Sequence, residues 1–119
     1  MIYPIEVIKT QINKEYLRKF LDKPFKEVIK FVVDVEKEII VFGGELHSDA
    51  QEMLLEEDSN SKNLWGGNLF FFENGKKIVI EHSSLINIKP SQNNFSMEIK
   101  DRKIREKIEK IFKKLIPDL

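Results

Sequence analysis

Two apolar runs separated by a short polar turn constrain the fold of this chain more than any other feature. Residues 69–72 and 78–80 are strongly apolar, and Glu73-Asn74-Gly75-Lys76 lies between them. Asn and Gly accept the positive φ angles that a type I′ turn needs at both central positions, and this turn matches the twist of paired strands. The pattern therefore predicts a β-hairpin with Asn74 and Gly75 at the centre of its turn.

Five further segments have the composition of β-strands. Residues 2–8 contain a proline, which cannot donate to a ladder, so they predict an edge strand. Residues 28–35 alternate apolar and polar side chains, as in a half-buried strand. Residues 39–42 are apolar on both faces and predict an interior strand. We also expect a strand at residues 85–88 and extended chain at residues 95–99.

Three segments have the signals of helices. Asn13 is positioned as an N-cap near the start of the chain, and Ser48 with Gln51 matches a capping box in the middle. Asp101 precedes a final helix with an apolar stripe formed by Ile104, Ile108, Ile111, Phe112 and Leu115. Together these segments predict an α+β fold in a single domain, residues 1–119. We expect a largely antiparallel sheet of about five to six strands, with about three helices mainly on one face.

The composition excludes several classes of protein. The sequence has no cysteine, so disulfides, thiolate metal sites and a catalytic thiol are ruled out. Its 20 Lys and Arg balance 20 Asp and Glu, so net charge gives no attraction to nucleic acid or anionic lipid. No apolar run approaches the roughly 20 residues that span a bilayer, and the start has no basic, apolar leader pattern. We expect a cytoplasmic protein with no cofactor and without membrane or nucleic-acid partners.

The charges are nevertheless segregated along the chain. Acidic side chains fill residues 45–58, where no Lys or Arg occurs, and basic side chains dominate residues 100–114. Such a pattern is typical of solvated helix faces, and less often of two surfaces that meet, within one chain or across a dimer.

Three polar, glycine- or asparagine-rich segments stand out between the apolar runs: residues 43–49, 63–68 and 87–94. Each lies where a predicted strand ends, so we expect them to line one site if the fold brings those ends together. Through these three segments, and through residues 33–37, the chain resembles a family of small prokaryotic proteins catalogued as domain of unknown function 5674. That family has no assigned activity, so the resemblance implies no catalytic residues.

Glu45 and His47 are the candidate catalytic residues. In extended chain they project to the same side, as an acid and a base would. Two histidines and no cysteine make a closed zinc site hard to assemble, so we expect no metal. A structural or solvent-exposed role for His47 is the alternative.

The candidate ligand-binding residues come from the second and third polar segments. Trp65 offers a flat apolar surface beside glycines, and Asn87 is an amide within an apolar stretch that needs polar partners. Lys89 adds a positive charge suited to a carboxylate or phosphate. The full candidate set is Trp65, Asn68, Asn87, Lys89, Ser91, Gln92 and Asn93. A core tryptophan and a network that fastens loops are the alternatives.

The sequence leaves two functions open. The first is a small binding or interaction protein, expected to be a homodimer, with a polar pocket at its strand ends. The second is a small enzyme that uses Glu45 and His47 on a polar small-molecule substrate. No spacing in the chain dictates a reaction.

Overall fold

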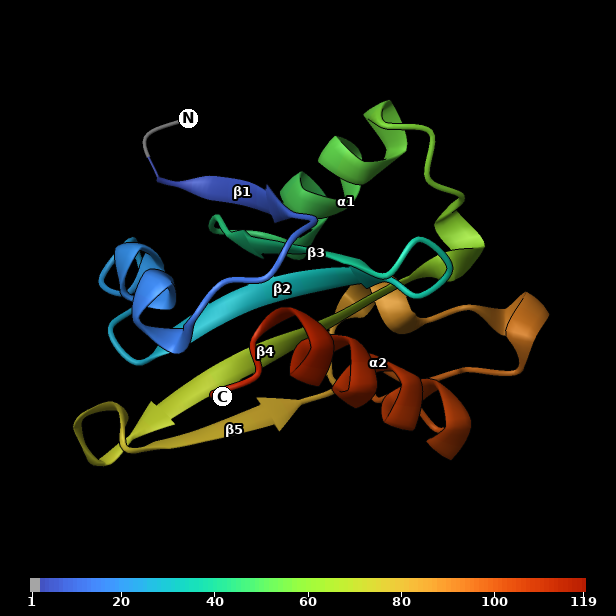
Figure 1. Cartoon of the computed structure of the whole chain (residues 1–119). Helices are drawn as coiled ribbons and strands as arrows, with labels where there is room; N and C mark the ends of the chain where they lie inside the picture. Colours follow the sequence, from blue (N-terminus) through green and yellow to red (C-terminus); the bar gives the residue numbers. More distant parts are fainter. Residues whose placement is uncertain (1–2) are drawn as a thin grey trace.

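The computed structural model describes residues 3–119, which form a five-stranded antiparallel sheet in the order β1-β3-β2-β4-β5 (Figure 1). The expected α+β fold is confirmed. The strands are β1 (Ile5–Ile8), β2 (Val28–Asp34), β3 (Ile39–Gly43), β4 (Leu64–Phe72) and β5 (Lys77–Glu81). The α-helices are α1 (His47–Glu56) and α2 (Arg102–Leu115), and a 3₁₀ helix spans Lys14–Phe20.

The strand predictions hold in part. β1 is an edge strand and β3 is interior, as expected, although residue 2 of the predicted edge strand lies outside the described residues. β2 is not half-buried, because it lies at the centre of the sheet and is covered on both faces. Val32 and Asp34, which alternate with the expected core positions, are therefore buried as well.

One face of the sheet is covered by α2 and the Lys14–Phe20 helix. Phe112 of α2 meets Phe31 of β2 edge-to-face, with ring centroids 4.8 Å apart, and Phe42 of β3 lies 5.8 Å from Phe112. Leu17 and Phe20 extend this core toward β1. Aromatic pairs in this geometry stabilise a core beyond their buried area.

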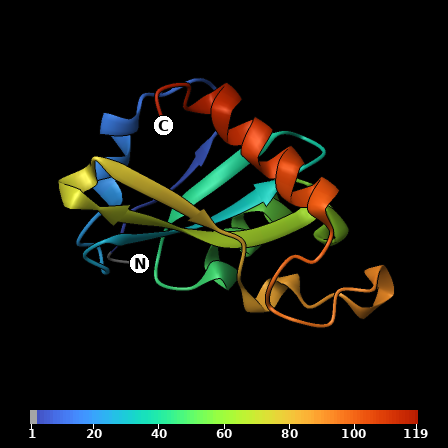
Figure 2. The ribbon, with the colours of Figure 1, turned by 90° about the horizontal axis from the view of Figure 1, so that it is seen from below.

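The opposite face is covered by α1. Ala50 and Leu54 of this helix pack on Val32, Val41 and Leu64 of the three central strands. Figure 2 shows α2 and α1 on opposite sides of the sheet. Two of the three longer helices share one face of the sheet, which agrees with the prediction that the helices lie mainly on one face. The third, α1, covers the opposite face.

The N-caps of the first and last helices are confirmed. Asn13 accepts the Tyr16 N–H, and Asp101 accepts the Lys103 N–H. The capping box at Ser48 is wrong, because α1 begins at His47 with Leu46 as its N-cap and no side chain caps it. The ring of His47, the first residue of α1, is hydrogen-bonded to β4.

The predicted hairpin is present, but its turn is longer than expected. Phe72 pairs with Lys77, so four residues connect the strands. Positive φ angles occur at Glu73, Asn74 and Gly75 (54°, 58° and 86°), so the two-residue type I′ turn on Asn74-Gly75 is not formed.

Two other local predictions are wrong. Residues 65–68 were expected at the end of a strand, but they lie inside β4. Residues 85–88 were expected to form a strand, but Leu85–Asn87 form a 3₁₀ turn. A Cβ on Gly66 would lie 2.8 Å from the Ser84 Cβ, and one on Gly67 would collide with the Glu81 carbonyl and the Phe31 ring. Glycine is therefore required in this strand by close packing.

Candidate functional site

The three polar segments meet on the backbone of Gly66 and Gly67. The His47 Nε2 lies 2.6 Å from the Gly67 carbonyl oxygen. The Asn87 Oδ1 accepts the Gly66 N–H at 2.8 Å, and the Asn87 Nδ2 donates to the Gly66 carbonyl at 2.9 Å. Residues far apart in the sequence are therefore fastened to one short stretch of β4.

A polar row crosses the sheet beside this junction. Lys30 of β2 pairs with Asn68 of β4, and Asn68 pairs with Glu81 of β5. Side chains alternate along a strand, so Lys30 projects to the same face as Val32, which is the face that α1 covers. The row lies just beyond the first turn of α1.

A pocket of about 370 Å³ opens above this row. Its floor is the polar row, and one wall is the start of α1. The opposite wall is the chain that follows β5. The lining residues are Lys30, Leu46, His47, Ser48, Asn68, Glu81, Ser83, Ser84, Leu85, Ile86 and Met97.

His47 is the titratable group most affected by this environment. Burial lowers the pKa of its imidazole, and the nearby Lys30 charge acts in the same direction. Its bond to Gly67 acts the other way, and so does the charge of Glu81. Because a carbonyl oxygen can only accept, Nε2 carries the proton of the neutral ring and Nδ1 is left as an acceptor. At neutral pH the pocket therefore contains an uncharged imidazole.

Two opposite charges line the pocket without an ion-pair partner within residues 3–119: Lys30 and Glu81. The Lys30 Nζ lies 5.2 Å from the centroid of the Phe25 ring, and the Glu81 carboxylate accepts the Asn68 Nδ2 at 2.8 Å. Asn68 Oδ1 is buried, and no group of the described chain donates to it. Buried polar atoms are nearly always paired, and Asn68 Oδ1 is one of two exceptions within residues 3–119; the other, His82 Nδ1, lies outside the pocket.

Of the residues predicted from sequence, His47 and Asn68 line the pocket. Glu45 is exposed in the turn before α1 and is not part of the lining. Trp65 is buried in the α2-side core, where its side chain is only 2% exposed. Asn87 is fully buried and fastens β4 to the chain after β5, because it also donates to the Met97 carbonyl.

The remaining predicted residues lie away from the pocket. Lys89 donates to the Ser61 and Ile86 carbonyls above the Trp65 ring, and burial lowers its pKa. Gln92 donates to the Lys62 carbonyl, and Ser91 and Asn93 are exposed. Lys89 and Gln92 therefore hold the loop after Asn87 against the loop before β4.

Lys30, Glu81, Ser83 and Ser84 were missed by the sequence analysis. A signal for Glu81 was present in the hairpin. In the hairpin, Phe72 and Lys77 are paired on either side of the turn. Four residues further from the turn on each strand, Asn68 is paired with Glu81. The register of β2 against β4 joins residues far apart in the sequence, so nothing local indicated that Lys30 would stand beside Asn68.

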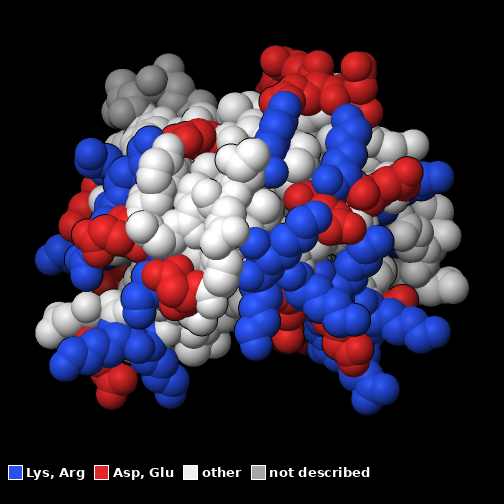
Figure 3. Space-filling view, in the orientation of Figure 1, with Lys and Arg blue, Asp and Glu red and all other residues white. Residues whose placement is uncertain are grey.

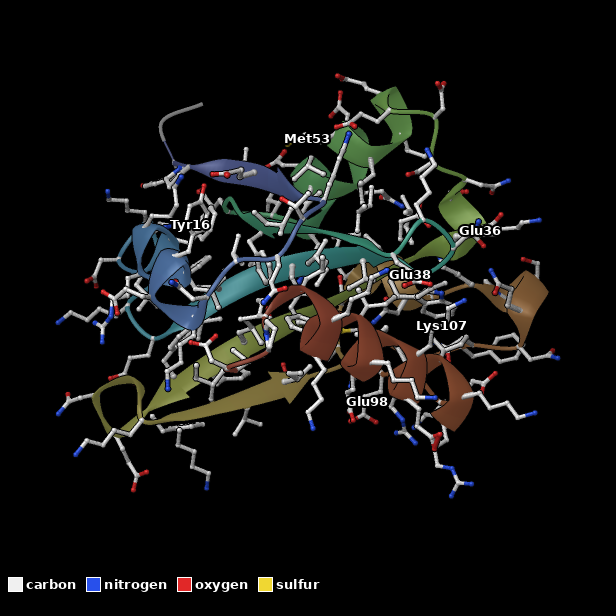
Figure 4. All side chains as sticks on the ribbon, viewed as in Figure 1. Tyr16, Glu36, Glu38, Met53, Glu98 and Lys107 are labelled. Carbon is white, nitrogen blue, oxygen red and sulfur yellow. The ribbon has the colours of Figure 1, made fainter. Side chains whose placement is uncertain are left out.

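A second charged surface lies on α2. Figure 3 shows Lys and Arg gathered over this helix and Asp and Glu over the far end of α1. Lys103, Lys107, Lys110 and Lys114 line a groove that also contains Glu38 and Glu106. Figure 4 shows Glu38 reaching toward α2 from the β2–β3 turn, where Lys114 donates to it at 2.9 Å and lowers its pKa. Carboxylates interleave these lysines, unlike the continuous positive track typical of nucleic-acid interfaces.

Two features of residues 3–119 bear on the wider classes of function. Within residues 3–119, no cluster of three His, Asp or Glu side chains has the geometry to hold a metal ion. None of the helices in this part of the chain has the length and apolar character needed to cross a membrane.

The chain matches a known protein family. The model of a family described as protein of unknown function, DUF5674, matches residues 6–115. No curated protein and no solved structure matches the chain.

Proposed function

Because the chain belongs to the DUF5674 family, which is described only as of unknown function, we propose from its geometry that it binds a small molecule in the pocket between α1, β4 and β5. One observation carries this proposal: an unpaired amide oxygen and two opposite charges without ion-pair partners within residues 3–119 converge on a pocket with apolar walls. Ligand sites typically have volumes of about 300–1,000 Å³, apolar walls and a few placed polar groups. At about 370 Å³, this pocket suits a metabolite-sized ligand.

A purely structural role explains the pocket less well. The buried Asn87 satisfies its polar atoms within the fold, as a structural amide should. Asn68 Oδ1 has no donor, and such a buried orphan costs about 1–3 kcal/mol. A ligand that supplies a donor after a small side-chain rotation would recover part of that free energy.

A thermal-shift screen of metabolites tests the proposal, since a ligand that binds only the folded state raises the melting temperature. Ser48→Trp would fill the pocket from the exposed start of α1, and Glu52→Trp is the matched control on the same helix, outside the lining. We expect at least one compound to stabilise the native protein and Glu52→Trp but not Ser48→Trp. Stabilisation that survives in Ser48→Trp would overturn the assignment of the pocket.

An enzyme is the second candidate, favoured by the neutral His47 with Nδ1 free to accept a proton. Glu45 does not line the pocket, so the carboxylate of such a site would be Glu81. Incubation of each stabilising compound with the protein, followed by NMR, tests this reading. Conversion that disappears in His47→Gln supports it, and unchanged compounds contradict it.

We also propose that the chain pairs with a second copy through the hairpin half of the sheet, where Figure 2 shows no helix on the α1 side. Val28, Phe70 and Val79 form an apolar cross-strand row there, and Phe72 stacks beside Phe70 with 45% of its surface exposed. A second copy that packs its own row on this one would remove these apolar side chains from water.

Light scattering over a range of concentrations tests the dimer. We expect a dimer mass for the native protein and a monomer mass for Val79→Lys. A monomer mass at high concentration would contradict the dimer but not the proposed ligand pocket, because ligand binding by the monomer can be measured separately.

A further inference from the structure

We infer that the ligand of the pocket is a zwitterion with an aliphatic side chain, as in a free apolar α-amino acid, with its carboxylate toward Lys30 and its ammonium toward Glu81. The inference rests on the proposed function and names the ligand class of that same pocket. It follows from which charges line the pocket and how the sheet spaces them.

The two charges stand on either side of Asn68. Neighbouring strands are about 4.8 Å apart, so Lys30 and Glu81, two strands apart in one row, have Cα atoms roughly 10 Å apart. Neither forms an ion pair within residues 3–119. A ligand with an ammonium group and a carboxylate on one carbon atom can lie between them and meet both.

The start of α1 adds to the part of the site that would bind the ligand's carboxylate. The first amides of a helix have no intrahelical acceptor, and no side chain caps this ten-residue helix. His47 and Ser48, which carry two of these amides, both line the pocket. Free N–H groups and the positive end of the helix dipole favour a carboxylate here.

The part of the site that would bind the ligand's ammonium group offers hydrogen-bond acceptors. The Glu81 carboxylate has lone pairs beyond the one used by Asn68, and Asn68 Oδ1 has no donor. His47 stays neutral because burial lowers its pKa, so its ring does not repel an ammonium group. A primary ammonium provides three donors for these acceptors.

The walls specify the rest of the ligand. Leu46, Leu85, Ile86 and Met97 line the pocket, and Leu46, Leu85 and Met97 are large apolar side chains left exposed. An aliphatic ligand side chain packed against them would remove apolar surface from water on both partners. Met and Leu side chains adapt to different aliphatic shapes, so we expect a preference for size over branching.

Titration calorimetry with three compounds that share the isobutyl side chain tests the inference: L-leucine, 3-methylbutylamine and 4-methylpentanoate. The amine lacks the carboxylate, and the acid lacks the ammonium. We expect L-leucine to bind the native protein at least tenfold more tightly than either analogue. In Lys30→Met leucine should lose its advantage over the amine, and in Glu81→Gln its advantage over the acid.

Matched controls remove charges from the same hairpin outside the pocket. Lys77→Met and Glu73→Gln should leave the affinity for leucine within twofold of native. Glu81 also accepts from Asn68, so Glu81→Asp serves as a second variant if Glu81→Gln lowers the melting temperature.

The outcomes separate this inference from the proposed function. Equal binding of the acid or the amine, abolished by Ser48→Trp, would overturn the zwitterion and leave the pocket standing. Unchanged leucine affinity in both charge variants would also overturn it. Absence of binding by leucine, valine, methionine and phenylalanine at millimolar concentration would overturn it as well, and the metabolite screen would then decide the pocket independently.

Discussion

Asn87 brackets the peptide groups of Gly66: its Oδ1 accepts the Gly66 N–H at 2.8 Å, and its Nδ2 donates to the Gly66 carbonyl at 2.9 Å. The side chain thereby satisfies both backbone groups of one residue, and a further bond to Met97 ties the post-β5 chain to the same point. The Asn87 side chain thus holds the chain after β5, which forms one wall of the pocket, against β4.

Asn87→Ala should destabilise the protein by about 3 kcal/mol, because it leaves several buried backbone groups without partners. Urea unfolding monitored by Trp65 fluorescence measures the change. Ser91→Ala, on the neighbouring exposed loop, is the control and should stay within about 0.5 kcal/mol of native. A loss below about 1 kcal/mol for Asn87→Ala would show that Asn87 does not hold this junction.

Gly67→Ala should destabilise more than Gly75→Ala. A Cβ on Gly67 collides with the Glu81 carbonyl and the Phe31 ring, whereas at Gly75 the nearest atom is an Arg18 nitrogen 3.7 Å away. Gly75 has a positive φ, so alanine there should cost about 1 kcal/mol. Melting temperatures of the two variants compare the effects, and the reverse order would contradict the close packing of β4 and β5.

Asp34→Ala should cost about 2–3 kcal/mol, because this buried carboxylate accepts the Glu36 and Lys37 amides and the Ser59 hydroxyl. Ser59→Ala removes only one of these bonds and should cost about 1 kcal/mol. Denaturant unfolding of both variants and of the double variant measures the coupling. Additive losses would show that the Asp34–Ser59 bond does not contribute.

The stability of the protein should fall as the pH falls below about 6.5, the ordinary pKa of histidine. His47 has a lowered pKa in the folded state, so the unfolded chain takes up a proton first and acidification favours unfolding. Above pH 6.5 the contribution is constant.

Unfolding free energies of native protein and His47→Gln between pH 5 and 8 test this dependence. The variant should lack the slope, and His82→Gln should retain it. The lowered carboxyl pKa values of Glu6 and Glu38 act below about pH 4.5 and stay outside this window. An identical slope in His47→Gln would contradict the assignment to His47.

The sequence predicted the features that depend on neighbouring residues. Asn13 and Asp101 cap helices because an Asn or Asp oxygen accepts an amide two or three residues on. Ser48 is not a cap because α1 begins one residue earlier, at His47, whose ring makes a long-range hydrogen bond to Gly67. Trp65-Gly66-Gly67 resembled a turn locally, whereas tertiary packing makes it a strand.

In the candidate site, too, the features that depend on neighbouring residues could be predicted, and those that depend on distant contacts could not. Residues 43–49, 63–68 and 87–94 were recognised by composition, and their members His47, Gly67, Gly66 and Asn87 meet in the fold. Which of them would face a pocket depended on strand register. Asn87 therefore became a fastener of the backbone, while Lys30, recognised by no local pattern, lines the pocket.

The most direct test of the pocket is a titration of ¹⁵N-labelled protein with L-leucine, followed through the backbone amide signals. We predict that the largest shifts occur at His47, Ser48, Gly66, Gly67 and Asn68 and saturate together. Unchanged signals at these five residues, or shifts confined to α2, would contradict leucine binding between α1, β4 and β5.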